Sequence, residues 1–310
     1  MKVIKGYHDL EHLIKNPVVT LGNFDGVHLG HQEILSRVRE KAREINGTSL
    51  VYTFYPHPLS LFTPGKALLT ITTLDEKLKL IEGCGIDLVI CEPFNLEFSR
   101  ITAEEFVKDI LHQRIGVKEI FVGEDYAFGS KRQGNIYYLM NMGKVLNFRV
   151  KIVNSIAIDN IIVKSSKIRG FIQEGDIAVA NRLLGRHFSF SGKVIKGKGR
   201  GANLGFPTAN IKPYKSLHPG VGVYAAWVNL NDQRFPGAMN IGYNLTFKDR
   251  ELSLEVHILD FNKDIYGQDL EIHFVARIRK EKAFSSPEEL VSQMQKDISD
   301  VRNILGINHI

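Results

Sequence analysis

The sequence contains few cysteines and lacks a long hydrophobic run. Cys84 and Cys91 are its only cysteines, and their spacing is not that of a metal or redox motif. This usage favours a reducing cytoplasm over a disulfide-stabilised secreted fold. No apolar stretch approaches the roughly 20 residues that a membrane helix requires. The segment Met1 to Lys5 has no signal-peptide core, and we expect no membrane partner.

Acidic residues are missing from one long interval. The chain of 310 residues has a net charge of +6, yet no residue between Asp176 and Asp232 is acidic. The basic residues of this interval are Arg182, Arg186, Lys193, Lys196, Lys198, Arg200, Lys212 and Lys215. This concentration of positive charge favours an anionic partner, either a phosphorylated small molecule or a nucleic acid. The alternative is a basic face that only contacts solvent. Interleaved aromatics for base stacking are not evident, so we expect no nucleic-acid partner.

The length and the ordinary apolar and charged fractions indicate two globular domains. From residue 1 to about 155, short apolar strands alternate with helical patterns, which is typical of a parallel α/β sheet. The expected strands are 18–21, 50–54, 86–90, 119–122 and 150–153. One expected helix follows His31, and a second covers 74–82. A third begins at Thr102, which forms a capping box with Glu105, and a fourth covers 177–184. Gly185 ends the last of these helices, so we expect the domain boundary near residue 186.

The stretch from Thr20 to His31 joins the first buried strand to the helix expected to open near His31. A helix N-terminus offers free backbone N–H groups and the positive end of the helix dipole to an anion. His28 and His31 lie there, three residues apart, and Gly30 lets the backbone come close. A nucleotide phosphate is therefore the expected ligand.

His28–Leu29–Gly30–His31 resembles the HxGH signature of nucleotidyltransferases, and residues 22–28 resemble the bacterial bifunctional riboflavin kinase/FMN adenylyltransferase (FAD synthetase) family. The resemblance implies a Rossmann-like parallel α/β adenylyltransferase domain at 1–186. It also implies an antiparallel β-barrel riboflavin kinase domain with a C-terminal helix at 187–310. Catalytic roles are implied for His28 and His31. ATP contacts are implied for Gly22, Asn23, Phe24, Asp25 and Gly30.

Three further segments of the first half resemble family motifs. Residues 56–58 resemble a PHP segment, and residues 123–129 resemble GxDFxFG with Tyr126 in the Phe position. The resemblance implies flavin contacts for His57, Asp125, Phe128 and Asn135; a structural histidine and a plain glycine loop are the alternatives. Residues 164–169 resemble SSTxIR, with Lys164 in place of the first serine. This implies that Ser165, Ser166 and a catalytic Arg169 meet the ATP phosphates, and we expect Ser166 to cap a helix.

From His187 the pattern changes to short alternating strands separated by glycine turns, which indicates an antiparallel barrel. The expected strands are 188–193, 222–229, 234–240, 252–258 and 268–277. A final helix is indicated by Ser286 at the N-cap, Pro287 at the first position and Glu289 at the third. Its apolar stripe, which includes Leu290 and Met294, is expected to pack on the barrel.

Residues 197–210 are rich in glycine and basic residues and lack the spacing of a Walker loop. Closely spaced glycines let backbone amides approach phosphate oxygens. The segment resembles the riboflavin kinase signature that ends in Pro-Thr-Ala-Asn, although the family usually has Arg where Ala202 stands. Phosphate contacts are expected from Gly197, Lys198, Gly199, Arg200 and Gly205. Thr208 and Asn210 lie on one side of an extended segment and suit Mg²⁺.

Glu255 and His257 share one face of an alternating strand. From the residues alone, Glu255 is a solvent-facing strand residue. The resemblance implies that Glu255 is the general base for the hydroxyl of the flavin.

The sequence thus predicts a cytoplasmic bifunctional enzyme that makes FMN from riboflavin and FAD from FMN, with ATP and Mg²⁺. The alternative is a flavin-binding regulatory protein or a kinase whose adenylyltransferase half has decayed, which Lys164 and Ala202 would favour. The sequence does not define the oligomeric state.

Overall fold

The computed structural model describes residues 1–62, 68–197, 201, 204–243 and 252–307. The chain forms two compact units. The first comprises Met1–Leu68 and Thr72–Lys164, and the second comprises Leu69–Ile71 and Ser165–Ile310. None of the helices in the described ranges is both long and apolar enough to cross a membrane.

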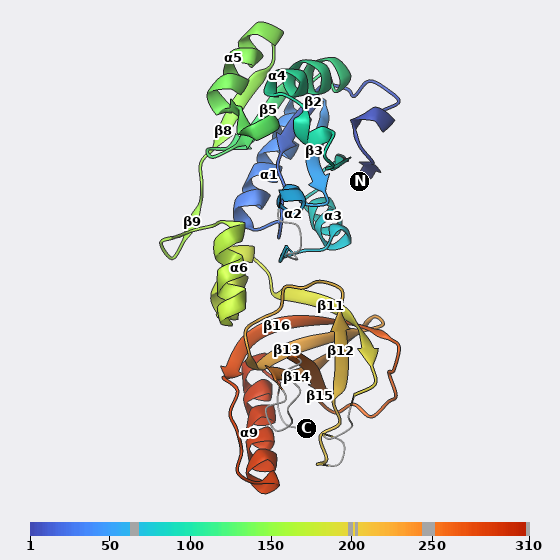
Figure 1. The fold of residues 1–310 in the computed structure, drawn as a ribbon, viewed down its shortest axis with the longest axis vertical. Helices are drawn as coiled ribbons and strands as arrows, with labels where there is room; N and C mark the ends of the chain where they lie inside the picture. Colours follow the sequence, from blue (N-terminus) through green and yellow to red (C-terminus); the bar gives the residue numbers. More distant parts are fainter. Residues whose placement is uncertain (63–67, 198–200, 202–203, 244–251, 308–310) are drawn as a thin grey trace. The chain divides into compact units, whose positions relative to one another are not determined.

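The first unit is built on a parallel sheet of six strands in the order β1-β4-β3-β2-β5-β8 (Figure 1). The strands are β1(Lys2–Ile4), β2(Pro17–Leu21), β3(Thr48–Tyr55), β4(Leu88–Pro93), β5(Glu119–Gly123) and β8(Arg149–Val153). Five of them confirm expected strands. The short edge strand β1 was not expected, because three residues are too few to show a periodic pattern.

Helices cover both faces of this sheet. One core contains residues of α1(Leu29–Glu44) and α3(Leu74–Gly83), and the other contains residues of the π-helical η3(Phe106–Arg114) and of α5(Ile136–Leu146). In β2, Val18 joins the first core and Val19 the second. Parallel strands buried on both faces read as continuous apolar runs, which is why they were visible in the sequence. The Rossmann-like α/β prediction is confirmed.

Short elements complete the first unit. The expected capping box of Thr102 and Glu105 is present at α4(Ala103–Glu105), and a second one joins Thr73 to Glu76 at α3. The remaining short elements are η1(Tyr7–Asp9), α2(Pro58–Phe62), η2(Phe98–Arg100), β6(Ala127–Phe128), η4(Ser130–Arg132), β7(Gly134–Asn135), β9(Ala157–Ile158) and β10(Ile161–Ile162).

The second unit is a closed antiparallel barrel in the order β11-β12-β15-β14-β13-β16, which confirms the expected barrel. Its strands are β11(Phe188–Ile195), β12(Ala209–Pro213), β13(Gly222–Leu230), β14(Gln233–Tyr243), β15(Leu252–Ile258) and β16(Asp269–Arg279). Alternate residues such as Phe190, Met239 and Val256 are fully buried. The residues between them form an outer face that can bear function.

Within the described ranges, helices α6, α7 and α9 accompany the barrel. The C-terminal α9(Pro287–Leu305) packs through Ile298 and Val301 near Ala225 and Ala238, as expected for its apolar stripe. Helices α6(Ser165–Glu174) and α7(Ile177–Leu184) belong to the same compact unit. The side chain of Asn181 accepts from the Phe188 N–H at 2.7 Å, and it donates to the Phe274 carbonyl of β16 at 2.9 Å. The expected domain boundary near residue 186 stays a prediction.

Candidate active sites

The first candidate site lies at the carboxyl edge of the parallel sheet. Strands β3 and β4 lie on one side of β2, and β5 and β8 lie on the other, so the strand order reverses at β2. Ligands of open α/β sheets bind outside the carboxyl ends of the strands at such a reversal. The segment that follows β2 carries Gly22, Asn23, Phe24, Asp25, His28, Gly30 and His31.

The turn after β2 has an unusual backbone conformation, which hydrogen bonds with Thr72 support. Phe24 has φ 50° and Val27 has φ 38°, and both side chains are buried. Such positive values are rare for bulky residues and rarer for β-branched ones. Asp25 is buried, and its Oδ1 accepts the Thr72 N–H at 3.2 Å, while the Gly26 N–H donates to the Thr72 hydroxyl at 3.1 Å. The carboxylate of Asp25 thus supports the turn, and its expected contact with ATP stays a prediction.

His28 and His31 form a stacked pair at the start of α1. The helix begins at Leu29, two residues before the expected start, because His28 is its N-cap and accepts the His31 N–H on Nδ1 at 3.2 Å. The two rings are 3.6 Å apart with an interplanar angle of 14°. An accepting Nδ1 leaves the proton of the neutral His28 ring on Nε2. A Cβ on Gly30 would lie 3.3 Å from the His28 ring, so glycine allows this close approach.

The expected flavin residues follow β3 and β5, the two strands that flank β2. The Nδ1 of His57 accepts the Leu59 N–H at 3.2 Å. After β5, Asp125 accepts a hydrogen bond from the Lys164 ammonium at 2.8 Å, which holds the pKa of this carboxyl below its usual range. Phe128 is buried among aromatic rings, and the side chain of Asn135 caps α5. The flavin contacts of all four residues stay predictions.

An aromatic group that the sequence analysis missed lies beside the ends of β3 and β4. The Phe54 ring meets the Phe94 ring at 5.6 Å and the Phe98 ring at 5.8 Å, and the Phe62 ring lies 6.4 Å from that of Phe94. Phe62 is 62% exposed. Phe54 and Phe62 are far in the sequence from Phe94 and Phe98, and only the adjacency of β3 and β4 reveals the four as one apolar wall.

Ser165, Ser166 and Arg169 lie in α6 of the second unit. The helix begins at Ser165, so Ser166 lies within its first turn and the prediction that Ser166 is the N-cap is wrong. Two adjacent serines do not indicate, from the sequence alone, at which residue the helix begins. The phosphate contacts of all three residues stay predictions.

The second candidate site lies on the outer face of the barrel around Glu255. Glu255 is opposite Asn210 on β12 and opposite Asn240 on β14, and directly opposite residues share a face. Its Oε2 accepts the Thr208 hydroxyl at 3.2 Å, and its Oε1 accepts the Ser253 hydroxyl at 2.6 Å. The prediction that Glu255 faces solvent on its strand is only half right, because the side chain is half-buried in a pocket wall.

Two pockets meet at this cluster. A pocket of about 270 Å³ is lined by residues including Pro207, Thr208 and Val256. A second one, of about 760 Å³, is lined by residues including Thr208 and Glu255. Thr208 belongs to both walls, and the Pro207 carbonyl beside it is 2.8 Å from the His257 Nδ1. A group held in one pocket can therefore face a group held in the other.

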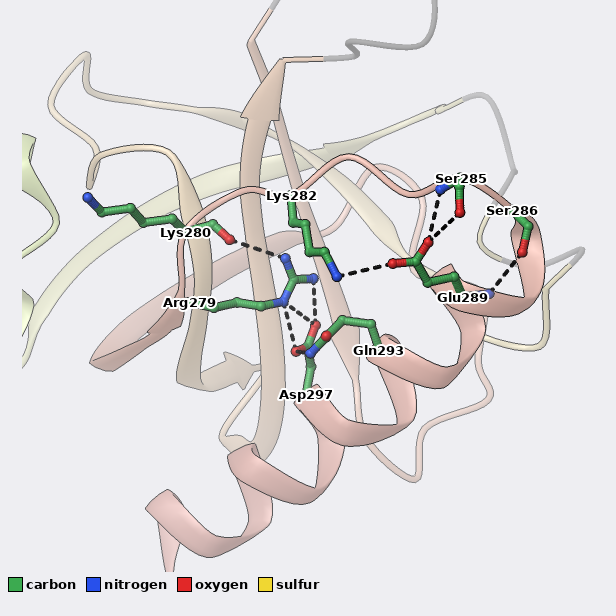
Figure 2. A network of polar contacts seen from close by, with 8 residues as sticks. All are labelled: Arg279, Lys280, Lys282, Ser285, Ser286, Glu289, Gln293 and Asp297. Atoms are coloured by element: carbon green, nitrogen blue, oxygen red, sulfur yellow. Dashed lines mark hydrogen bonds and ion pairs between the residues drawn. The ribbon is translucent and has the colours of Figure 1, made fainter.

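One wall of the larger pocket is formed by residues of β16 and α9, which an ion pair joins (Figure 2). Arg279 donates from Nε and Nη2 to both carboxylate oxygens of Asp297, at 2.8–3.1 Å. Gln293 donates to the same carboxylate at 2.9 Å. The guanidinium lies 5.6 Å from the centre of the Phe284 ring, which also lines this pocket. The ion pair thus joins β16 to α9 and shapes the wall between them.

The glycine-rich segment is described only in part. A Cβ on Gly197 would lie 2.0 Å from the side-chain amide of Asn210, so a larger residue there would displace the Asn210 side chain. Gly205 is exposed with φ +86°, a conformation that favours glycine. Lys198, Gly199, Arg200 and Ala202 lie outside the described residues. Lys215, one of the basic residues of the acid-free interval, is buried and donates to the Ile71 carbonyl at 2.7 Å, so that interval is not one uniform basic face.

Oxygen donors dominate the Glu255 cluster. Thr208 and Glu255 are joined by a hydrogen bond, and Asn210 is opposite Glu255 in the strand register. Hydroxyl, amide and carboxylate oxygens fit a hard cation such as Mg²⁺, which also coordinates nucleotide phosphates. Within the described ranges, no group of three or more His, Cys, Asp or Glu residues forms an all-protein metal site.

Comparisons with known proteins cover nearly the whole chain. The FAD synthetase family model matches residues 11–167, and the riboflavin kinase model matches residues 184–305. A bifunctional riboflavin kinase/FMN adenylyltransferase of Buchnera aphidicola subsp. Schizaphis graminum is 38% identical, covering 99% of this chain and 100% of the relative. The Escherichia coli K12 protein of the same name is 36% identical, covering 99% of each chain. A crystal structure described as a macrolide-efflux protein from Streptococcus pneumoniae has a TM-score of 0.88 at 31% identity, covering 97% of this chain and 98% of that one.

Proposed function

The chain belongs to the bifunctional riboflavin kinase/FMN adenylyltransferase family, and on this premise we propose which of its residues carry each reaction. It is an enzyme of flavin cofactor synthesis that phosphorylates riboflavin to FMN and adenylylates FMN to FAD, with ATP as the co-substrate. The division into two modules is supported by one observation above all: each compact unit has its own candidate site, of a different construction.

In the second unit, Glu255 takes the proton of the riboflavin 5′-hydroxyl, whose oxygen attacks the γ-phosphorus of ATP while ADP leaves. The larger pocket accepts riboflavin and the smaller one accepts the nucleotide, since Thr208 lies in both walls and Glu255 lies beside it. The hydroxyls of Thr208 and Ser253 keep the carboxylate oriented toward the transfer point. Thr208 and Asn210 would hold Mg²⁺, which when bound would neutralise charge on the transferring phosphoryl group.

In the first unit, a phosphate oxygen of FMN attacks the α-phosphorus of ATP in line, and pyrophosphate leaves. No side-chain nucleophile is required, so catalysis rests on positioning and on charge stabilisation. The N-terminus of α1 and the His28–His31 pair supply the positive field and hydrogen-bond donors. Arg169, Ser165 and Ser166 are on α6 of the second unit, so their proposed contacts with ATP phosphates rest on the sequence motif alone. The phenylalanine wall of Phe54, Phe94 and Phe98 suits the flat flavin ring.

Riboflavin, FMN and ATP are the proposed small-molecule partners, and the cytoplasm is the proposed location, supported by the low cysteine content of the chain. The assignment is tested by incubating the purified chain with riboflavin, ATP and Mg²⁺ and separating the flavins by chromatography. We expect FMN to appear first and FAD to follow. FMN that accumulates without FAD would contradict the adenylyltransferase assignment, and unchanged riboflavin would contradict the kinase assignment.

Lys164→Ser should raise the KM for FMN about threefold with little change in kcat. The change removes the cation that neutralises Asp125, and an unpaired carboxylate at this edge repels an anionic substrate. Because the pair is largely exposed, the effect should shrink in 1 M salt, where the Debye length is about 3 Å. Steady-state kinetics at two salt concentrations measure it, with Lys144→Ser on the exposed face of α5 as the control. A lower KM in Lys164→Ser would mean that the lysine hinders this site.

Asp297→Asn should raise the KM for riboflavin about tenfold and lower the melting temperature. The amide replaces one of the carboxylate oxygens that hold Arg279, and removing one partner of a part-buried ion pair leaves the other poorly solvated. The loosened wall includes Phe284, so riboflavin binding suffers while the KM for FMN in adenylylation does not. Kinase kinetics and thermal unfolding check this, with Asp300→Asn on the same helix as the control. An unchanged KM for riboflavin would show that the wall does not depend on the ion pair.

A further inference from the structure

A buried lysine lies beneath the turn that follows β2. Lys77, on α3, is only 6% exposed. Its ammonium donates to the Asn23 carbonyl at 3.3 Å, to the Thr53 hydroxyl at 3.1 Å and to the Phe54 carbonyl at 3.2 Å. An ammonium has three N–H donors, and these acceptors match all three. Lys77 therefore joins the turn after β2 to the end of β3.

Lys77 places a charged side chain in the buried interior of the first unit. None of its three acceptors is a carboxylate, and a buried cation without a directly bonded anion is costly. Two ionisable groups face it: Asp25, which is engaged with Thr72, and Cys91 of β4. Burial lowers the pKa of Lys77, and both neighbours oppose that shift. An apolar side chain would avoid the cost of a buried charge but would deprive the Asn23 and Phe54 carbonyls of this donor, so the lysine serves to hold these two backbone groups.

The hydrogen bond to Asn23 also sets the orientation of one peptide group in the turn. In a trans peptide the C=O and N–H bonds point in opposite directions. A carbonyl of Asn23 that is held by Lys77 therefore turns the Phe24 N–H away from α3. Phe24 has a positive φ and a buried ring, so the turn has little freedom to adjust if this peptide rotates.

We propose that Lys77 is a positioning residue for adenylyl transfer, which fixes the Gly22–Val27 turn and adds a buried positive charge beneath the site of the anionic substrates. The inference rests on the proposed adenylyltransferase role of the first unit. It adds a residue on a different element from the His28–His31 pair. The Thr72 contacts and Lys77 together make the 72–77 segment the support of that turn.

Lys77→Met tests the proposal, because methionine keeps the unbranched shape and removes the charge and the donors. We expect kcat/KM for FMN adenylylation to fall at least 30-fold, and the affinity for inorganic pyrophosphate in calorimetry to fall about tenfold. Riboflavin kinase activity of the same preparation should stay within twofold of wild type. Lys79→Met is the matched control, since Lys79 lies on the exposed face of the same helix.

A second readout separates positioning from mere support of the fold. Adenylylation by the wild type should decline at alkaline pH, below the ordinary lysine range, as Lys77 loses its proton. The decline should persist in Cys91→Ala, and the residual activity of Lys77→Met should lack it. Thr53→Val keeps the charge and the Lys77 hydrogen bond to the Asn23 carbonyl, while it removes one acceptor of Lys77 and the Thr53 hydroxyl that also donates to that carbonyl at 3.2 Å, so it should cost only about threefold.

Three outcomes would overturn the inference. One is a folded Lys77→Met variant with wild-type kcat/KM and pyrophosphate affinity. Another is an alkaline decline that Lys77→Met retains. The third is a loss of activity that merely tracks the fraction of unfolded protein in Lys77→Met and Thr53→Val. A wild-type chain that forms no FAD would instead contradict the proposed function of the first unit.

Discussion

FAD synthesis should fall by about 10²–10³-fold in His31→Ala, while riboflavin phosphorylation stays at the wild-type rate. His31 stacks on His28 at 3.6 Å and meets the Phe24 ring at 5.0 Å, at the end of the helix where the phosphates are proposed to bind. Removing one preorganised donor to a developing negative charge typically costs this much in kcat. The kinase is spared because its proposed groups lie in the other unit.

The measurement is a pair of assays on one preparation, with FMN and ATP for adenylylation and with riboflavin and ATP for phosphorylation. His12→Ala is the control, since His12 is exposed in the same unit. His28→Ala should lose as much or more, because it removes both a ring and the cap of α1. An equal loss of both reactions in His31→Ala would count against two independent sites.

Much of the first site could be predicted from the sequence, because its elements have local signals. Buried parallel strands read as apolar runs, and the segment after β2 bears a motif of adjacent residues. Lys77 could not be found this way. A lysine in an amphipathic helix is usually on the solvent face, and only the fold shows that Lys77 points inward while Lys79 remains exposed. The phenylalanine wall was missed for the same reason: strand adjacency brings Phe54 and Phe94 together.

The second site depends even more on register. Alternation along β15 predicted that Glu255 and His257 share a face, and it could also have included Ser253, two residues earlier. Asn240 comes from another strand, and its position opposite Glu255 follows from the pairing of β14 with β15. The Arg279–Asp297 pair joins a strand to a helix and carries no sequence signal at all. The sequence therefore indicates the residues that we propose for the chemistry more readily than those that shape the pocket.

Riboflavin phosphorylation should fall by about 10²–10⁴-fold in Glu255→Gln, the range that a positioned general base contributes. Glutamine keeps the size of the side chain and one oxygen that can accept from Thr208 or Ser253, so the local structure should persist. What it cannot do is accept the proton of the 5′-hydroxyl at neutral pH. The loss should therefore appear in kcat, with the KM for riboflavin within a few fold of wild type.

Glu271→Gln is the matched control, because Glu271 is a barrel glutamate outside both pocket walls and hydrogen-bonds to Asn229 and Ser189. Supplying FMN directly to Glu255→Gln should give FAD at the wild-type rate, which shows that the first unit is intact. If Glu255→Gln phosphorylated riboflavin at a near-normal rate, Glu255 would not be the base. The cluster of Thr208, Asn210 and Glu255 would then act on the nucleotide alone, since its oxygen donors would still suit the cation that accompanies ATP.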